Sequence, residues 1–438
     1  MSRPLKNRKK PLPQIRTFTD RIEHDPSHHL TGPFRPQTSA HYRPFSDLND
    51  AVFTRFTRSR PLGQGADSPG LRSIPNAPWS TQSQGTWTDI RTLRWVIVPT
   101  SSLKILLFFI VLWANWELLS PYVAKDISNP FSPLLFISHP IPSSSDHDPR
   151  YQKGYLDFVF LAYYIVVWSF VRQAITIYLC RPLARWFGIK KSAKMDRFGE
   201  QGYAMIYFAF TGFWGLRIMS QLPTWWYNTK YFWIDYPHWE MKPELKAYYL
   251  VQAAYWCQQL IVLLLGLEKP RKDYHELVAH HFVTLWLVGW SYLVNLTFIG
   301  NAVYLSMDLP DSIFAFSKLL NYIQWDRAKV VTFSLFVCIW TYFRHFLNWV
   351  ILYSVWFEFD LMPETSKRWS PDDGVWLVWW MKYQIFVPLV LLQALNLFWY
   401  FLIWRVAARA LSNQNITDVR SDDEDDGEDD GHDDKKED

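Results

Sequence analysis

Two neighbouring stretches decide the fold class: ELVAHHFVTLWLVGWSYLVNLTF at residues 276–298 and AVYLSMDLPDSIFAFSKLLNYI at residues 302–323. Each is long enough to cross a bilayer as a helix, which takes roughly 20 residues, and each carries ionisable side chains within an apolar sequence. Such groups cost several kcal/mol inside a membrane unless they are paired or face a cavity. The two stretches therefore predict an all-α membrane protein whose helices enclose polar groups.

Six further apolar segments have the length of a membrane span: 103–120, 155–179, 201–222, 247–267, 330–357 and 382–406. The segment at 302–323 is the weakest of the eight by hydropathy, because Asp308, Asp311 and Lys318 interrupt it. The charged residues, 20% of the chain, crowd its two ends and a few short loops. A membrane protein segregates charge in this way, so we expect a polytopic protein with about eight transmembrane helices.

The charges of the loops predict the orientation of these spans. Basic loops alternate along the chain with loops that are balanced or acidic, as the positive-inside rule requires. The basic ones lie before the first span and at 181–200, 268–274 and 324–329, and the others lie at 121–154, 223–246 and 358–381. This alternation predicts an even number of spans with both termini in the cytosol.

The two ends of the chain differ in charge. Residues 1–100 are rich in Pro, Arg, Ser and Thr, do not begin with a signal peptide, and predict a largely disordered basic cytosolic arm. Residues 411–438 predict an acidic cytosolic tail, since residues 421–438 alone hold twelve acidic and two basic side chains. Lys435 and Lys436 near its end resemble a dilysine retrieval signal, which predicts the endoplasmic reticulum membrane; the alternative is a merely solvated tail.

Polar side chains recur at helical spacing in three adjacent spans. His280, His281 and Thr284 share about one turn of the fifth span. Asp308 and Asp311 are three residues apart in the sixth span, and Arg344 and His345 stand together in the seventh. These stripes predict helices arranged around a common polar cavity.

Each of these groups also has a structural interpretation. A membrane histidine often serves as an interhelical hydrogen-bond partner, and Arg344 could simply neutralise one of the aspartates. The spacing of ligands typical of a zinc site is missing, so no metal is predicted, although a His-Asp metal site stays open. No nucleic-acid motif accompanies the basic charge, and the three cysteines suggest no disulfide framework. From the residues alone, an enzyme, a transporter and a structural scaffold remain open.

Four blocks of sequence together resemble one family. They are His280-His281-Phe-Val-Thr284, Trp290-Ser291-Tyr292, Met307-Asp308-Leu-Pro-Asp311-Ser312 and Lys318-Leu-Leu-Asn321-Tyr322. In this order and spacing they resemble the signature of the ceramide synthase (longevity-assurance) family within the TLC domain, over roughly residues 155–410. The blocks Phe343-Arg344-His345 and Leu395-Asn396-Leu397-Phe398-Trp399 are similar to the fungal members.

The resemblance favours the enzyme branch over the alternatives, which are a non-catalytic TLC lipid transporter or sensor and a translocon-associated protein, because those proteins lack the paired histidines. It implies two N-terminal transmembrane helices and a basic cytosolic loop at 101–200, followed by a TLC catalytic domain at 201–410. In that domain the last six helices would form a barrel around an intramembrane active site.

The family also implies the partners: fatty acyl-CoA as co-substrate, a sphingoid base such as dihydrosphingosine or phytosphingosine, and membrane lipids. No permanently bound cofactor and no nucleic acid are expected. A small accessory membrane subunit and homo- or hetero-dimers are compatible with the resemblance.

The same resemblance assigns the site. His280, His281, Asp308 and Asp311 carry over as catalytic residues, and the expected substrate-binding residues are Thr284, Ser291, Tyr292, Tyr304, Lys318, Asn321, Tyr322, Arg344 and His345. An imidazole can accept the proton of the amine or can itself attack the thioester. A carboxylate can orient that imidazole or hold the ammonium of the base. Direct transfer and transfer through an acyl-imidazole both remain open.

Overall fold

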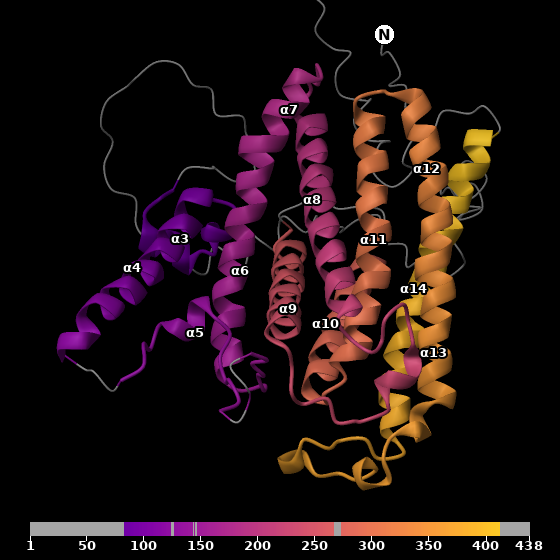
Figure 1. Ribbon diagram of the computed structural model, residues 1–438. Helices are drawn as coiled ribbons and strands as arrows, with labels where there is room; N and C mark the ends of the chain where they lie inside the picture. Colours follow the sequence, from indigo (N-terminus) through magenta and orange to yellow (C-terminus); the bar gives the residue numbers. More distant parts are fainter. Residues whose placement is uncertain (1–82, 124–126, 143, 145–146, 267–272, 412–438) are drawn as a thin grey trace, which may run out of the picture. The chain divides into compact units, whose positions relative to one another are not determined.

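The computed structural model describes residues 83–123, 127–142, 144, 147–266 and 273–411, and their regular structure is helical (Figure 1). Most of the predicted arm, the basic loop before residue 273 and the acidic tail with its dilysine lie outside these residues. At the end of the predicted arm, Thr86–Arg91 form the short helix α3 and Arg94–Val96 form a 3₁₀ turn, η2. The buried carboxylate of Asp89 accepts hydrogen bonds from Ser101 and from the backbone of Gln84, which ties α3 to the next helix.

Within the described ranges, each of the eight predicted apolar segments falls largely on a long helical segment. These are α4 (Pro99–Val123); α6 (Leu156–Ala174), which continues through the π-helical η3 (Ile175–Cys180) into α7 (Arg181–Trp186); α8 (Ser192–Ser220); α9 (Pro243–Leu264); α10 (Tyr274–Leu293); α11 (Thr297–Tyr322); α12 (Asp326–Trp340), which continues through the π-helical η5 (Thr341–Leu347) into α13 (Asn348–Phe357); and α14 (Met381–Leu411). The short helix α5 (Ser132–Leu135) and the 3₁₀ turns η4 (Thr229–Phe232), η6 (Phe359–Leu361), η7 (Glu364–Ser366) and η8 (Pro371–Asp373) lie in the connections.

One predicted boundary lies in a different place from the observed one. The fifth apolar segment was expected to run to residue 298, but α10 ends at Leu293 and α11 already begins at Thr297. Asn295 between them has a φ of 60°, a left-handed conformation that ends a helix and that asparagine tolerates. Its side-chain amide donates to the carbonyl of Gly374 at 2.7 Å, so a partner far along the chain fixes this turn.

Four of the long segments are long and apolar enough to span a membrane by composition: Pro99–Val123, Leu156–Trp186, Asp326–Phe357 and Met381–Arg409. The remaining four, α8 to α11, have 29, 22, 20 and 26 residues, which is sufficient length. Their lower hydropathy follows from the polar side chains on them, including His280, Asp308 and Lys318.

Six of the helical segments contact one another in a closed order. α8 contacts α9, α9 contacts α10, α10 contacts α14, α14 contacts α13, and α12 contacts α11, which returns to α8. Figure 1 shows α8, α11 and α12 running alongside one another in this arrangement. We call these six segments the helical ring. α6 packs on α9 from outside the ring, and α4 packs on α6.

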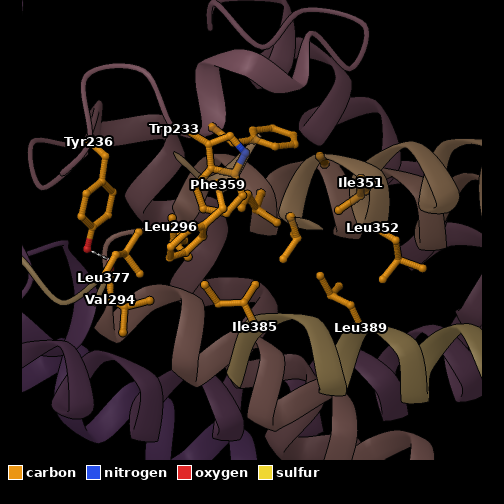
Figure 2. Packing of buried hydrophobic residues seen from close by; sticks show 14 of the residues in the cluster. Trp233, Tyr236, Val294, Leu296, Ile351, Leu352, Phe359, Leu377, Ile385 and Leu389 are labelled. Carbon is orange, nitrogen blue, oxygen red and sulfur yellow. Dashed lines mark hydrogen bonds between the residues drawn. The ribbon is translucent and has the colours of Figure 1, made fainter. Parts of the chain in front are cut away.

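A large apolar core lies where α10 ends and α11 begins (Figure 2). It joins the loops around Trp233 and Leu377 to residues of α13 and α14 such as Ile351 and Leu389. The polar atoms of two of its largest fully buried side chains are satisfied: Trp233 Nε1 donates to Ser354 at 2.8 Å, and the Tyr236 hydroxyl donates to the Val294 carbonyl at 2.8 Å. Each fully buried aliphatic or aromatic side chain stabilises such a core by about 1.5–3 kcal/mol.

A buried ion pair attaches α6 to the ring. Lys246 Nζ on α9 lies 2.7 Å from Asp157 Oδ1 on α6, and both side chains are buried. Tyr292 on α10 donates to the other carboxylate oxygen at 2.8 Å. Lys246 also donates to the carbonyls of Ser138 and Gln152 at 2.7 and 2.6 Å. These bonds compensate both charges, which a buried pair requires.

Candidate active site

Two cavities lie among the helices of the ring. The polar basin, of about 240 Å³, is lined from all six ring segments by residues that include Tyr203, Trp256, His281, Asp311, Arg344 and Trp399. Its lining residues from α8 and α11 lie mainly on the first half of α8 and on the second half of α11. The basin is therefore at the end of the ring next to the loops that the sequence predicts to be cytosolic.

The apolar chamber, of about 60 Å³, occupies the opposite half of the ring. Its lining comes mainly from α10, α11 and α14 and is dominated by aliphatic side chains such as Val288, Val303 and Leu389. Three residues line both cavities: Trp256 on α9, His280 on α10 and Arg344 in η5. We call these three the junction residues.

The two histidines are packed between tryptophans. The His280 and His281 rings lie 5.7 Å apart, and the Trp256 ring lies edge-on to both, at 5.5 and 5.6 Å. Trp399 contacts His280 from α14 at 5.3 Å. His281 Nδ1 lies 2.8 Å from the Leu277 carbonyl. Because a carbonyl only accepts, Nδ1 carries the proton, and a neutral His281 then has its lone pair on Nε2.

Arg344 is held on several sides. Its Nη2 lies 2.6 Å from Asp311 Oδ2 and donates to the Met307 carbonyl at 3.0 Å, and its Nη1 donates to Asn396 Oδ1 at 3.0 Å. The guanidinium also lies over the Trp340 ring, 4.3 Å from its centre. The pairing with an aspartate agrees with the structural interpretation of Arg344, and the cavities add that this residue faces the site.

The two aspartates occupy different places. Asp311 lines the polar basin with the histidines. Asp308 is fully buried, lines neither of the two cavities, and accepts a hydrogen bond from Gln252 Nε2 on α9 at 2.6 Å. Gln252 in turn accepts from the hydroxyl of Tyr207. Residues three apart on a helix diverge by about 60°, so one aspartate can face the basin while the other contacts α9.

The expected substrate-binding residues divide in the same manner. The apolar chamber is lined by Thr284, Ser291 and Tyr304, and the polar basin by Lys318 and Tyr322. Tyr292, Asn321 and His345 line neither cavity. The Tyr292 hydroxyl instead donates to Asp157, which forms the ion pair that attaches α6 to the ring. His345 Nδ1 accepts a hydrogen bond from Gln393 Nε2 at 2.8 Å, and the His345 ring packs on Tyr400.

Several site residues were not found from the sequence. Trp256, Gln252 and Trp399 had no assigned role there, although Gln252 and Asn396 are amides inside apolar segments and could have been suspected on that ground. A tryptophan among 25 carries no such signal. Within the part of the chain that the structure describes, no group of three or more His, Cys, Asp or Glu side chains lies close enough to hold a metal ion.

Comparison with known proteins places the chain in a family. Residues 197–405 match the TLC domain. Sphingosine N-acyltransferase lac1 of Schizosaccharomyces pombe is 38% identical over 73% of this chain and 80% of its own length. Ceramide synthase LAG1 of Saccharomyces cerevisiae is 37% identical over 67% and 70% of the two chains, and ceramide synthase 4 of Bos taurus is 35% identical over 44% and 46%. The chain is thus a polytopic membrane protein of the ceramide synthase (sphingosine N-acyltransferase) family.

Proposed function

We propose that this protein transfers a fatty acyl group from acyl-CoA to the amine of a sphingoid base, with His280 and His281 as the reacting side chains. As a member of its family the chain is a sphingosine N-acyltransferase. The observation that supports the proposed site is that His280 lies where the polar basin meets the apolar chamber. An acyl thioester has this same division, with a polar nucleotide on one side of the reacting carbon and a hydrocarbon chain on the other.

The two cavities give each part of the substrates a place. The apolar chamber receives the part of the hydrocarbon chain next to the reacting carbon, and the polar basin receives the pantetheine and the polar end of the base. Arg172, Arg197 and Lys318 line the basin beside the acidic Glu200, which pairs with Arg197 at 3.2 Å, so an anionic substrate would meet basic and acidic side chains there. The basin adjoins the loops predicted to be cytosolic, so acyl-CoA enters from the cytosol.

The chemistry needs a base, a nucleophile and a leaving group. The amine nitrogen forms the new bond to the carbonyl carbon, the carbon–sulfur bond breaks, and the proton lost by nitrogen ends on the CoA thiol. His281, with its lone pair on Nε2, accepts that proton from the amine and returns it to the thiolate. If the transfer has two steps, His280 first takes the acyl group, since it is the histidine that borders both cavities. Once acyl-CoA fills the basin, the bound substrate and the surrounding ring exclude water from either intermediate.

We further propose that all eight long helical segments cross the membrane of the endoplasmic reticulum, with both termini in the cytosol. The alternation of basic and acidic loops supports this orientation, and the dilysine near the carboxyl end supports the compartment. The helical ring is then the catalytic barrel, and α4 and α6 lie outside it. The proposal also includes binding of a small accessory membrane subunit and formation of homo- or hetero-dimers.

The test uses the purified full chain with acyl-CoA and dihydrosphingosine, measuring ceramide by mass spectrometry and free CoA by a thiol reagent. His280→Ala and His281→Ala should each lower the rate by about 10²–10⁴-fold, the usual contribution of general acid–base catalysis. His275→Ala is the matched control, because His275 is an exposed histidine on the same helix. More than about a tenth of the wild-type rate in both variants would contradict the assignment. Ceramide transport without CoA release would identify a lipid transporter instead.

A further inference from the structure

The three junction residues share a second property. Each has one side-chain nitrogen that is buried and has no hydrogen-bond partner among the described residues: Nε1 of Trp256, Nδ1 of His280 and Nε of Arg344. The three residues are 7%, 8% and 3% exposed. A buried donor without a partner costs about 1–3 kcal/mol, and most buried polar groups in proteins are paired.

An unpaired indole alone would not identify a site. The indole N–H groups of Trp116, Trp290, Trp340 and Trp376 also have no partner among the described residues. Trp256 differs from these four because it borders both cavities and packs edge-on against both histidines. Its location, together with the unpaired Nε of Arg344, points to a ligand atom that approaches the junction.

The type of atom follows from the chemistry of the two groups. An indole nitrogen and a guanidinium nitrogen donate hydrogen bonds and cannot accept them. They therefore suit an acceptor such as oxygen and not the protonated ammonium of the base, which only donates. The acyl thioester has one such atom next to its reacting carbon, the carbonyl oxygen, and this oxygen gains negative charge when the carbon is attacked.

We propose that Trp256 Nε1–H and Arg344 Nε–H form the oxyanion hole of this enzyme, a role that rests on the proposed function of the site. When the nucleophile bonds to the carbonyl carbon, the π electrons move to the oxygen, and both donors bind the resulting oxyanion. When the C=O bond re-forms, the carbon–sulfur bond breaks and the thiolate leaves with the electron pair. The same donors serve whether the nucleophile is the amine or the His280 imidazole.

The surroundings hold both donors in place before the reaction. Both terminal nitrogens of Arg344 are bonded, by Asp311, Asn396 and the Met307 carbonyl, and Trp340 packs on the guanidinium face. The plane that contains Nε is therefore fixed. Trp256 packs edge-on against both histidine rings and is almost fully buried. Donors that need no reorganisation are the ones that stabilise an oxyanion most.

The decisive variant is Trp256→Phe, which keeps an aromatic ring and removes the donor. We expect kcat to fall by about 10²–10³-fold, the usual effect of losing one oxyanion donor. A thioether analogue of acyl-CoA, which has no carbonyl oxygen, should inhibit the variant and the wild type with the same inhibition constant. Trp376→Phe is the matched control, because it removes an equally unpaired indole N–H outside both cavities; it should keep the wild-type kcat.

Three further variants cover the other outcomes. Benzothienylalanine at position 256 keeps the bicyclic shape and replaces only N–H by sulfur, so it decides the question if Trp256→Phe fails to fold. Arg344→Lys keeps a positive charge beside Asp311 and removes Nε–H; we expect kcat to fall more than the affinity for the thioether. Trp256→Phe combined with Arg344→Lys should lose less than the product of the single effects, since both donors bind one oxygen.

The results separate this inference from the function on which it rests. A wild-type protein that forms no ceramide would contradict the proposed function. An active wild type with Trp256→Phe within about threefold of its kcat would overturn only the oxyanion hole. An equal loss of kcat and of thioether affinity in the benzothienylalanine variant would also overturn it, because the indole would then act by packing.

Discussion

At the scale of single residues, the ion pair of Asp311 and Arg344 combines two environments. Arg344 is 3% exposed, while the Asp311 side chain is 23% exposed because it faces the polar basin. Removing one partner of a buried pair leaves the other charge uncompensated, which costs about 3–5 kcal/mol when both groups are fully buried. The exposure of Asp311 makes the two partners unequal.

This asymmetry predicts the stability of three variants. Asp311→Asn leaves the buried guanidinium without its counter-ion and should lower the thermal unfolding temperature strongly. Arg344→Met leaves a carboxylate that the basin can hydrate and should cost less. Asp311→Leu combined with Arg344→Met should recover much of the stability and none of the activity. Thermal unfolding of the purified variants in detergent measures all three, and an Asp311→Asn variant as stable as the wild type would contradict the account.

The residues of the site were predictable to different degrees. His280, His281 and Asp311 stand out in the sequence because ionisable groups are rare inside apolar segments, and all three line the polar basin. The position of Asp308 depends on Gln252, which is 56 residues away in the chain, so its spacing from Asp311 could not reveal it. The role of Trp256 depends only on which helices meet, and the sequence contains no pattern for that.

At the scale of elements, the π-helical turn η5 places Arg344 at the junction. A π-helical turn takes up one extra residue within an otherwise α-helical segment, and such turns often occur at functional sites. α12 and α13 continue on either side of η5 with α-helical geometry. The extra residue therefore affects the direction of the side chains in η5 more than the path of the helix.

Deleting Phe346 tests this role of η5. Phe346 is exposed, so its loss removes little packing. The shortened turn should become α-helical, so that α12 and α13 continue as one regular α-helix. Arg344 should then leave the junction, and ceramide formation should fall at least about tenfold while the helical content and the unfolding temperature change little. The substitution Phe346→Ala is the control and should keep the wild-type rate. A fully active deletion variant would show that the π-helical turn is dispensable.

A close contact between α9 and α11 gives a second prediction. A Cβ atom at Gly300 would overlap the hydroxyl of Tyr249, which is hydrogen-bonded to Ser291, and all three residues line the apolar chamber. Gly300→Ala should therefore displace Tyr249 and lower stability by about 1–3 kcal/mol, as other overpacked sites do. At Gly289 on α10 a Cβ would meet open space, so Gly289→Ala should leave stability unchanged or raise it. Equal unfolding temperatures for the two variants would contradict this packing.

The elements were more predictable than their ends. Length and hydropathy located all eight long segments, because each of them carries a largely apolar sequence of about 20 residues or more. The turn between α10 and α11 was missed because it depends on the bond from Asn295 to Gly374, a contact between distant parts of the chain. The order of contacts in the ring is likewise a tertiary property that hydropathy does not contain.

At the scale of the whole molecule, the entry of acyl-CoA depends on the orientation in the membrane. We expect Lys190→Cys, in a background without the three native cysteines, to react with an impermeant maleimide when only the plasma membrane is opened. Glu240→Cys and Asp372→Cys should react only after the endoplasmic reticulum membrane is opened. All three positions are exposed, so a failure to react reports the membrane and not burial. Reaction of Asp372→Cys from the cytosol would contradict eight spans.

The ion pair between Asp157 and Lys246 has a consequence for biogenesis. Asp157 leaves the ribosome well before either of its partners exists, and Tyr292 follows it by 135 residues. At roughly 5–20 residues per second, this interval lasts roughly 7–27 s. Throughout it the nascent α6 carries a carboxylate that lacks at least one of its final partners. The ion pair that attaches α6 to the ring can therefore form only after α9 has been synthesised.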